Sequence, residues 1–300
     1  MPRGVPKAGF RMTKNRVVRA SSQAGLRSTR NTVQMAPAVA APVKKETDAQ
    51  IREKLAERFD AMDAMAASTM RGINKSMIIS GPAGLGKSFG VMTLAEQFEG
   101  KGKQVSVIKG YVRPTGLYKT LYENRHPDCV IVFDDADSVF MDDVCLNLLK
   151  AACDMTRTRK LHWLTETKME DEDGERMPRS FEFEGSVIFI TNYDFDDMIA
   201  RGNRLAPHFQ ALISRSIYLD LAMKTNRDYI VRIHQVVEMG MLDEQGISKS
   251  VQKEILDFIE TNADRLRELS LRMVMKLAAL VRMDSRNWQK MARVTCLRNN

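Results

Sequence analysis

The stretch MIISGPAGLGKSFG, residues 77–90, decides the fold. Its apolar start belongs to a strand predicted over 76–80, and residues 81–88 fit the pattern GxxxxGK[ST] ahead of a helix predicted over 86–100. Glycines in such a loop let backbone N–H groups surround a phosphate, and the helix N-terminus adds a favourable partial charge. The alternative is a Gly-rich turn without a ligand, but the flanking strand and helix favour a phosphate pocket.

Two side chains of this loop carry its chemistry. We expect Lys87 to reach the β- and γ-phosphates of a nucleotide and Ser88 to place its hydroxyl on Mg²⁺. The predicted nucleotide-binding residues are Gly81, Pro82, Ala83, Gly84, Leu85, Gly86, Lys87 and Ser88.

A second polar segment, VIVFDDAD, supplies two carboxylates. Its apolar residues place Asp134 at the carboxyl end of a strand predicted over 129–133, where open α/β sheets bind ligands. We expect Asp134 to hold Mg²⁺ through its water shell and Asp135 to orient and deprotonate the attacking water. An isolated Asp pair is often a solvated strand end, an alternative that the phosphate loop makes weaker.

Two later segments deliver single polar side chains. VIFITN ends in Asn192, which we expect to hydrogen-bond the water or the γ-phosphate; the alternative is a cap of the next helix. LSLRMVMKL places Arg272 near the start of a late helix, after a predicted cap at Ser270, from where it reaches back toward the γ-phosphate. An ordinary surface arginine is the alternative for Arg272.

ALISRS places Arg215 between a helix and the last predicted strand. We expect this arginine to project to a neighbouring subunit and to neutralise charge that develops on the transferred phosphoryl group. Arg201 and Arg204 are weaker candidates for the same role, and a plain surface residue is the alternative.

Apolar strands alternate with helices along the middle of the chain, which indicates a parallel sheet covered on both faces. Strands are predicted over 76–80, 104–110, 129–133, 186–191 and 215–221, and helices over 47–70, 86–100, 116–125 and 142–155. From about residue 224 only helical periodicity remains. The predicted fold is α/β: a parallel five-stranded sheet with helices on both faces over 46–222, followed by a small α-helical domain over 223–300.

Segments 160–167 and 180–185 alternate in polarity and are joined by an acidic stretch, MEDEDGER. This pattern predicts a β-hairpin insertion at about 158–185, directly before the strand that ends in Asn192.

The first 45 residues differ in composition from the rest and are predicted to be a disordered basic tail. They contain no Asp or Glu, and their basic residues are Arg3, Lys7, Arg11, Lys14, Arg16, Arg19, Arg27, Arg30, Lys44 and Lys45. These unopposed positive charges exceed the formal net charge of the whole chain, which is +8, so the basicity of the chain belongs to this segment. A solubilising arm, an arm that contacts nucleic-acid phosphates and a mitochondrial transit peptide are the three interpretations; Pro2 and Pro6 argue against the last.

The ordered set GPAGLGKS, VIVFDDAD, FITN, ISRS and LSLR resembles the AAA+ ATPases, as Walker A, Walker B, sensor 1, arginine finger and sensor 2. The resemblance covers residues from about 50 to 285, and ISRS is similar to the SRC arginine-finger motif of clamp-loader subunits. It implies an ATP-driven ring, commonly a hexamer, with sites at subunit interfaces. The implied core, over 46–222, is a three-layer P-loop NTPase sandwich with strand order 5-1-4-3-2, and the helical domain over 223–300 is its α-helical lid.

The hairpin before sensor 1 resembles the pre-sensor-1 hairpin branch of that superfamily, which includes viral superfamily-3 helicases, Holliday-junction motors and Clp-type unfoldases. In such helicases the hairpin grips DNA. Here its acidic tip would repel phosphates, with only Lys168, Arg176 and Arg179 to offset it.

The segment KGYVRPTG, residues 109–116, looks like the aromatic pore loop of Clp-type unfoldases, with Arg113 in place of a glycine. Lys109, Tyr111 and Arg113 are equally suited to stack on single-stranded bases and contact phosphates. The plain alternative is that Tyr111 packs under the lid or against a neighbour.

At Walker B the family usually has Glu where this chain has Asp135. Asp is one methylene shorter than Glu, which places the base about 1.5 Å farther from the water unless the backbone compensates. A displacement of about 1 Å costs on the order of 100-fold in rate, so slow hydrolysis is an alternative outcome.

We expect an ATPase that uses ATP and Mg²⁺ and works as a homo-oligomeric ring on DNA, as a helicase, loader or branch-migration factor of a phage or bacterium. The alternatives are a Clp-like protein remodeller and an ATP-gated scaffold with slow hydrolysis.

No apolar run approaches 18 residues, which argues against a membrane span. We expect a cytoplasmic protein in a bacterium or phage-infected host, with the mitochondrial matrix as the alternative, and reduced buried thiols at Cys129, Cys145, Cys153 and Cys296.

Overall fold

The computed structural model describes residues 10–13, 16–19, 46–165, 169–170 and 174–298. The chain divides into two units, Met1–Lys45 and Glu46–Asn300. In the first unit, β1 (Phe10–Thr13) and β2 (Arg16–Arg19) pair as antiparallel strands. The rest of the predicted basic tail lies outside the described residues, so its disorder stays a prediction.

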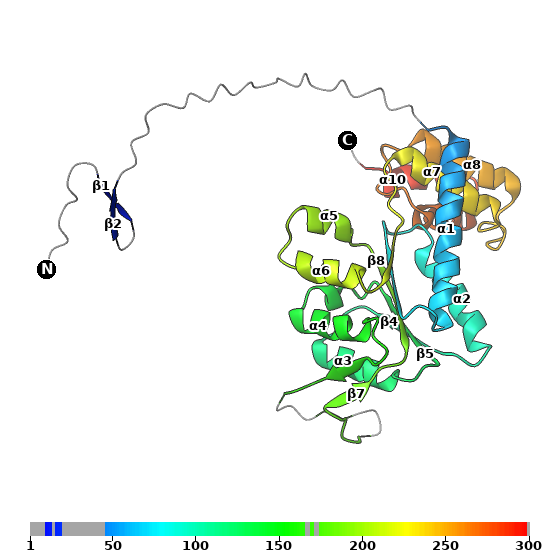
Figure 1. Ribbon diagram of the computed structural model, residues 1–300. Coiled ribbons are helices and arrows are strands. Elements are labelled where there is room, and N and C mark those ends of the chain that lie inside the picture. Colours follow the sequence, from blue (N-terminus) through cyan, green and yellow to red (C-terminus); the bar gives the residue numbers. More distant parts are fainter. Residues whose placement is uncertain (1–9, 14–15, 20–45, 166–168, 171–173, 299–300) are drawn as a thin grey trace. The chain divides into compact units, whose positions relative to one another are not determined.

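A five-stranded sheet forms the centre of the second unit (Figure 1). Its strands are β3 (Ser76–Ser80), β4 (Gln104–Lys109), β5 (Cys129–Asp134), β8 (Ser186–Thr191) and β9 (Ile217–Asp220). They are all parallel and lie in the order β4-β5-β8-β3-β9. Numbered along the chain this order is 5-1-4-3-2, read from the other edge, so the predicted α/β P-loop NTPase fold is confirmed.

Helices cover both faces of the sheet because successive strand residues point to opposite sides. Met77 and Ile79 pack with α1 (Asp48–Met70) and α2 (Lys87–Glu99). Ile78 packs instead with the other layer. That layer consists of α3 (Pro114–Glu123), η1 (Asp137–Phe140), α4 (Asp143–Ala152), α5 (Phe195–Ala200) and α6 (Ala206–Ile213). Figure 1 shows these two helical layers on either side of the strands.

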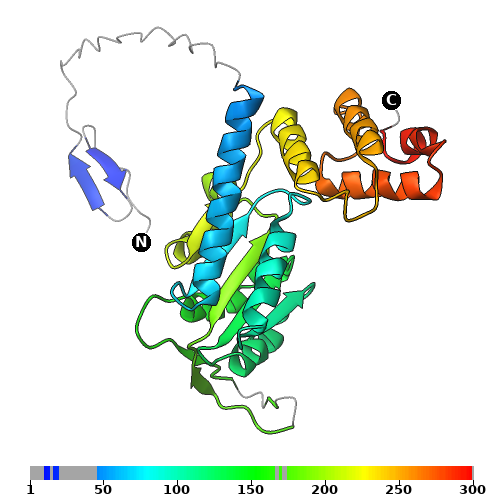
Figure 2. The ribbon, with the colours of Figure 1, turned by 90° about the vertical axis from the view of Figure 1, so that its right-hand side faces the viewer.

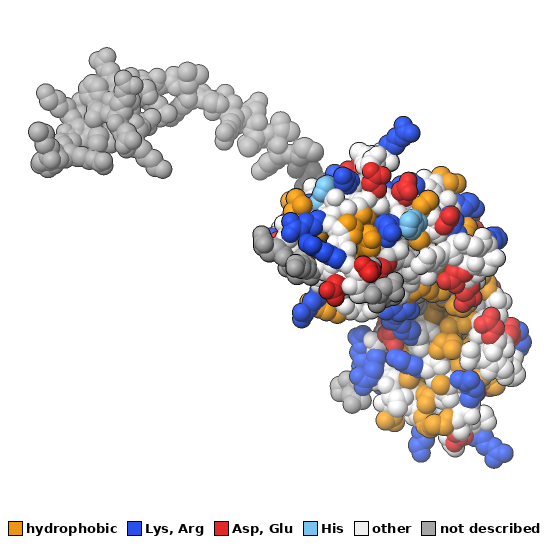
Figure 3. Space-filling model, turned by 90° about the horizontal axis from the view of Figure 1, so that it is seen from below, with side chains coloured by type: hydrophobic (Ala, Val, Ile, Leu, Met, Phe, Trp, Pro, Cys, Tyr) orange, Lys and Arg blue, Asp and Glu red, His pale blue; other side chains and the backbone are white. Residues whose placement is uncertain are grey.

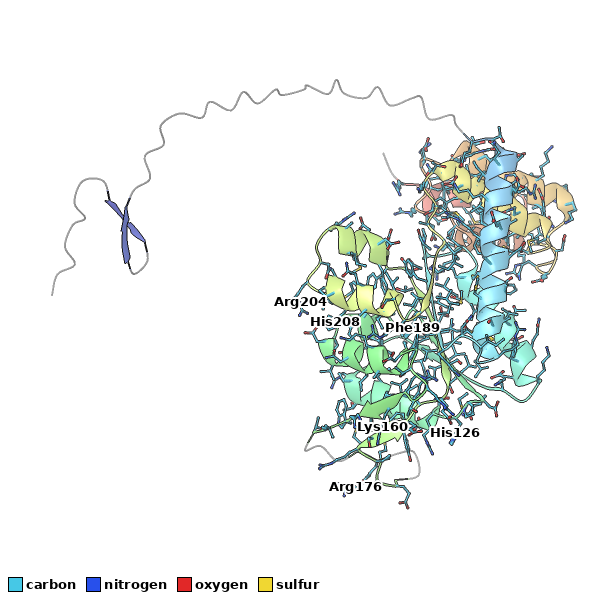
Figure 4. All side chains as sticks on the ribbon, in the orientation of Figure 1. His126, Lys160, Arg176, Phe189, Arg204 and His208 are labelled. Atoms are coloured by element: carbon cyan, nitrogen blue, oxygen red, sulfur yellow. The ribbon has the colours of Figure 1, made fainter. Side chains whose placement is uncertain are left out.

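Aromatic side chains fill the second layer. Phe189 of β8 lies at the middle of the sheet (Figure 4) and stacks on Phe133 with ring centroids 5.3 Å apart. Phe140 contacts Phe189 at the same centroid distance and meets Phe195 edge to face at 5.1 Å. The short helices η1 and α5 are thereby held against the strands that end at the candidate site.

Helix α1 begins with a capping box, in which the Thr47 side chain accepts from the backbone N–H of Gln50 and the Gln50 side chain accepts in return. The helix packs against α2 and also against α7 (Asn226–Glu238), as Figure 2 shows. Arg52 pairs with Glu238, and Gln235 Nε2 donates to the Arg52 carbonyl at 2.8 Å. This helix therefore joins the α/β layers to the last helices.

The predicted hairpin is present as β6 (Lys160–His162) and β7 (Ser180–Glu182), which pair antiparallel. Buried Arg159 anchors its base, donating at 2.7 Å to the carbonyls of Ala152 and Gly185. Figure 4 places Arg176 at the far end of the hairpin. Lys168 and most of the acidic tip lie outside the described residues.

The last helices pack around an apolar cluster of their own that includes Ile255, Val274 and Leu277. They are α7, α8 (Lys249–Thr261), α9 (Leu271–Met283) and α10 (Trp288–Thr295). Ser270 caps α9, as predicted, by accepting from the Met273 N–H. We propose that these helices are the predicted lid, with its boundary near residue 223.

Some element ends differ from the sequence predictions. Helix α3 starts at Pro114, because proline is favoured in the first turn, where its missing N–H costs no hydrogen bond. Strand β9 starts only at Ile217, since Arg215 and Ser216 still donate to Leu212 and Ile213 and continue the turn of α6. The turn η1 is too short to show periodicity and was not predicted.

All four cysteines are buried and free. Burial raises the pKa of Cys145 to about 12 and that of Cys153 to about 11. Over the described residues, no helix combines the length and the apolar character that a membrane crossing requires.

Candidate functional site

The parallel sheet brings polar residues together at the carboxyl ends of its strands. Lys109 at the end of β4 lies in register with Asp134 at the end of β5, and Asp134 lies in register with Ile190 of β8. The loop after β3 starts beside them, because Ser80 is in register with Thr191. This edge is where ligands bind in open α/β sheets.

The loop of residues 81–88 turns from β3 into α2. Gly86 is the residue before the helix and has φ 94°, and Gly84 has φ 76°, a region that side-chain-bearing residues rarely adopt. A Cβ on Gly84 would lie 2.6 Å from the Cβ of Ser270. Both positions therefore require glycine, and Gly84 also because the helix that starts at Ser270 approaches it closely.

Lys87 is buried in the centre of the site. Its Nζ donates to the Gly81 carbonyl, to the Pro82 carbonyl at 2.9 Å and to Asn192 Oδ1 at 3.2 Å. Burial lowers the pKa of Lys87 to about 8, with Asp135 opposing the shift. A cation in such a place gains from an anionic ligand, because the ligand replaces the lost solvation.

Ser88 and Asp134 form the second contact of the site. Ser88 Oγ donates to Asp134 Oδ1 at 2.6 Å, and Asp134 is buried. A hydroxyl and a carboxylate oxygen are the donors that Mg²⁺ prefers, so this pair fits the predicted metal. The other oxygen, Asp134 Oδ2, lies 2.9 Å from Lys109 Nζ.

Asp135 lies next to this pair in a left-handed backbone conformation, with φ 53°. It is the non-glycine residue with positive φ among the described residues, and such conformations store strain at functional sites. Asn192 Nδ2 donates to Asp135 Oδ1 at 2.9 Å, and Arg272 Nη2 lies 3.9 Å from Asp135 Oδ2. Asn192 thus links Lys87 to Asp135, while Asp194 caps the following helix α5.

The last helices contact the loop directly. The Leu271 N–H donates to the Gly84 carbonyl at 2.8 Å. Arg232 of α7 stacks 3.4 Å from the centroid of the Phe59 ring, and its Nε donates to the Leu85 carbonyl at 3.4 Å. Burial lowers the pKa of Arg232 to about 10. Two helices beyond residue 223 therefore rest on the phosphate loop.

Arg215 is not brought to this site. It precedes β9, and its backbone carbonyl accepts from Ser76 Oγ at 3.1 Å, at the amino end of the sheet. Its own Nη1 donates to the Ala211 carbonyl at 2.8 Å. Arg201 pairs with Asp197, and Arg204 pairs with Asp143 at the turn between α5 and α6 (Figure 4). None of these three arginines contacts the residues around Lys87.

The predicted aromatic loop leaves the same edge of the sheet. Tyr111 is 77% exposed, and Arg113 is exposed as well. Ser138 of η1 holds the loop at Val112, by accepting from its N–H at 2.8 Å and donating to its carbonyl at 3.4 Å. Tyr111 therefore does not pack under the last helices, and the alternative that it packs against a neighbour stays a prediction.

Sequence reasoning missed two residues of the site, Asp137 and Arg232, and one contact of a third, Lys109. Lys109 was expected to belong with Tyr111 and Arg113, but its side chain turns to Asp134. Asp137 accepts from Thr191 Oγ1 at 2.6 Å, and burial raises its pKa. Arg232 lies far along the chain from the loop it contacts. Of these residues, only Asp137 had a signal in the sequence, because it is the last acid of the motif VIVFDDAD.

A cavity of about 440 Å³ lies beside Pro82 and Ala83 of the loop. Its other walls come from the last helices, including Asn226, Tyr229 and Ser270. Its volume is within the range of small-molecule sites.

Comparison with known proteins gives a relative from a phage. No protein-family model matches the chain. An Enterobacteria phage T4 protein, described as an uncharacterized 36.7 kDa protein in the nrdC-mobD intergenic region, is 38% identical over 250 residues, which are 83% of this chain and 76% of that protein.

Two kinds of solved structure are similar to the chain. NtrX from Brucella abortus in complex with ADP is 14% identical, with a TM-score of 0.48, over 76% of this chain and 50% of that one. The RuvB Holliday junction branch migration motor of Thermotoga maritima is 17% identical, with a TM-score of 0.45, over 83% and 69%. The chain spans about half the length of NtrX. The strand order and the loop geometry carry the fold assignment.

The contact between Gly84 and Ser270 predicts the cost of a side chain at this point of the loop. Gly84→Ala should lower the free energy of unfolding by about 2 kcal/mol more than Gly102→Ala, measured by urea titration. Gly102 is the matched control, since its φ is 87° and nothing lies within 4 Å of an added Cβ. Adding Ser270→Gly to Gly84→Ala should recover most of the difference; equal costs for both alanines would contradict the contact.

Proposed function

We propose that this chain, which belongs to the same family as the 36.7 kDa phage T4 protein, is an AAA+-type ATPase that hydrolyses ATP with Mg²⁺ in an oligomeric ring. One observation carries the proposal: contacts link Lys87, Asn192, Asp135 and Arg272 in one chain, and Ser88 contacts Asp134 beside it, all around one phosphate loop. The site residues keep the roles that the sequence predicts.

Lys87 would leave the carbonyls of Gly81 and Pro82 and donate to the β- and γ-phosphates, while the backbone N–H groups of residues 81–88 surround them. Ser88 and Asp134 would hold Mg²⁺, which supplies charge neutralisation between the phosphates when it is bound. The 2.6 Å contact between their oxygens supports this pairing, because both already face one point.

Asp135 would accept the proton of the attacking water, and Asn192 would hold that water against the γ-phosphate. Asn192 is suited to both contacts because its amide lies between Lys87 and Asp135. Arg272 would donate to the γ-phosphate from the lid, since α9 begins on the phosphate loop. Its partner Asp135 is half-exposed, so their 3.9 Å contact is weak and easily exchanged for a phosphate.

The position of Arg215 supports the proposed ring. An arginine at the amino end of the sheet cannot reach the phosphate loop of its own chain, but it can meet the loop of an adjacent copy. We propose that Arg215 completes the neighbouring site, in a ring that is commonly hexameric in the AAA+ superfamily.

A nucleic acid is the polymer that we propose for this motor. Exposed Tyr111 and Arg113 support base stacking and phosphate contact, and the basic residues 1–45 support electrostatic attraction. Figure 3 shows Lys and Arg interspersed with Asp and Glu on one face of the folded unit, so we expect the affinity to come from the tail and the loop. We place the protein in the cytoplasm of a bacterial or phage-infected cell. The exposed Tyr111 equally suits a polypeptide, which is the second candidate substrate.

The test of the function is ATP turnover with and without a polymer. Wild-type protein should hydrolyse ATP with Mg²⁺, and Lys87→Ala should lose nucleotide binding and turnover, whereas Lys103→Ala at the distant end of β4 should keep both. Single-stranded DNA, duplex DNA and an unfolded protein are added in turn. Stimulation by DNA that falls with salt supports the proposed substrate; stimulation by the unfolded protein alone supports the second candidate. Unchanged turnover in Lys87→Ala would refute the site.

The lowered pKa of Lys87 predicts proton uptake on binding. With a pKa of about 8 in the free protein, Lys87 is about three-quarters neutral at pH 8.5, and the nucleotide's charge raises its pKa again. Calorimetry in two buffers of different ionisation enthalpy should show uptake of about 0.7 proton per Mg-ATP at pH 8.5 and little from Lys87 at pH 6.5. The charge-retaining control Lys87→Arg should show none, and equal values at both pH values would contradict the shift.

The trans role of Arg215 predicts complementation. Arg215→Ala should bind ATP normally and lose at least about 100-fold in turnover, because a transition-state charge is no longer neutralised. Mixing it with Asp135→Asn, which lacks the base, should restore part of the activity at shared interfaces. Arg201→Ala is the matched control and should keep full turnover; a strictly monomeric protein with normal turnover would exclude the role.

A further inference from the structure

Lys109 is the unexpected charge at the metal site. Its Nζ lies 2.9 Å from Asp134 Oδ2, and the side chain of Asp134 is 4% exposed while that of Lys109 is 62% exposed. Ser88 already donates to Asp134 Oδ1. Both oxygens of the carboxylate that is expected to hold Mg²⁺ are therefore engaged by residues of the protein.

The position of Lys109 is fixed by the sheet. It is the last residue of β4, in register with Asp134, so the strand pairing itself brings the two side chains to one place. A cation and a divalent metal cannot both occupy Asp134 Oδ2, because like charges repel at contact distance. Whatever holds Lys109 on Asp134 opposes metal binding, and whatever moves it away favours metal binding.

The chain beyond Lys109 leads directly to the exposed loop. Gly110 follows with φ 85° and nothing within 4 Å of an added Cβ, so no neighbouring group blocks a change of its backbone conformation. Tyr111 comes next and is exposed, and Val112 is tied to Ser138. One glycine therefore separates Lys109, which contacts Asp134, from Tyr111, whose side chain is exposed to a polymer.

From this arrangement we propose that Lys109 is a positioning residue that competes with Mg²⁺ for Asp134, and that a single-stranded nucleic acid bound at Tyr111 and Arg113 withdraws it. A phosphate group beside Gly110 offers Lys109 a second anionic partner. When Lys109 moves to that phosphate, it leaves Asp134. The polymer thereby raises the affinity of the site for Mg²⁺. This inference rests on the proposed function, since it assigns a metal to Asp134.

Mg²⁺ dependence of nucleotide binding tests the competition without relying on turnover. A non-hydrolysable ATP analogue is titrated calorimetrically at several Mg²⁺ concentrations. Lys109→Met should lower the Mg²⁺ concentration at half-effect by about 5-fold, the scale of one partly exposed ion pair, and should leave affinity without Mg²⁺ unchanged. Lys109→Arg should behave as wild type because it keeps the charge. Lys103→Met, which removes a lysine paired with Asp128 at the other end of β4, should also behave as wild type.

The outcomes separate the two proposals. If wild-type protein fails to bind the analogue at any Mg²⁺ concentration, the proposed function is wrong. If it binds and Lys109→Met has the wild-type Mg²⁺ dependence, the function stands and the role of Lys109 is refuted. A loss of analogue affinity in Lys109→Met that is equal with and without Mg²⁺ would show a structural role and also refute competition.

An oligothymidylate tests the link to the loop. It should lower the Mg²⁺ half-effect concentration in wild-type protein and in Lys103→Met, and should have no such effect in Lys109→Met, where the competing charge is already gone. An equal shift in Lys109→Met would overturn the link through Lys109. A shift produced by an unfolded polypeptide and not by the oligonucleotide would overturn nucleic acid as the ligand.

Discussion

Parallel pairing of β4, β5, β8 and β3 is the constraint on which the site depends. The strands start at scattered points of the sequence, yet their register places Lys109 beside Asp134 and Ser80 beside Thr191. Apolar side chains on both faces hold that register, because a slip of one residue would move every side chain to the opposite layer. The polar residues at the carboxyl edge contribute little to this framework and are free to serve chemistry.

At Asp135 the backbone conformation and the side chain together place the carboxylate that we propose as the base. Aspartate is a methylene shorter than the glutamate usual in the AAA+ superfamily, and this chain holds Asp135 at φ 53°. In that conformation its carboxylate reaches the Asn192 amide at 2.9 Å. The unusual backbone angle and the shorter side chain thus occur at the same residue. This coincidence argues that the backbone compensates for the shorter side chain and keeps the carboxylate in place.

The sequence predicted what depends on local pattern and failed where contact is made by distant segments. The buried strands were legible because Met77–Ile79 and Val130–Phe133 are continuous apolar runs beside helices. The capping of α9 by Ser270 was also legible, since caps are local. The contact of Lys109 with Asp134 was not predicted because it is set by strand order, and Arg232 went unnoticed because its contact with the Leu85 carbonyl joins α7 to a loop far away in the sequence. The hairpin was predicted, but most of the acidic residues of its tip lie outside the described residues.

The burial of all four cysteines has a practical side. With a pKa of about 11, the Cys153 thiol is ionised in only about one molecule in 10,000 at pH 7, and thiolates are the species that alkylating reagents attack. A cysteine introduced on the exterior, at Tyr111 or on the helices α7 to α10, would accept a fluorophore or spin label almost alone. The native chain therefore offers a nearly silent background for following the distance between the loop at Tyr111 and these helices in solution.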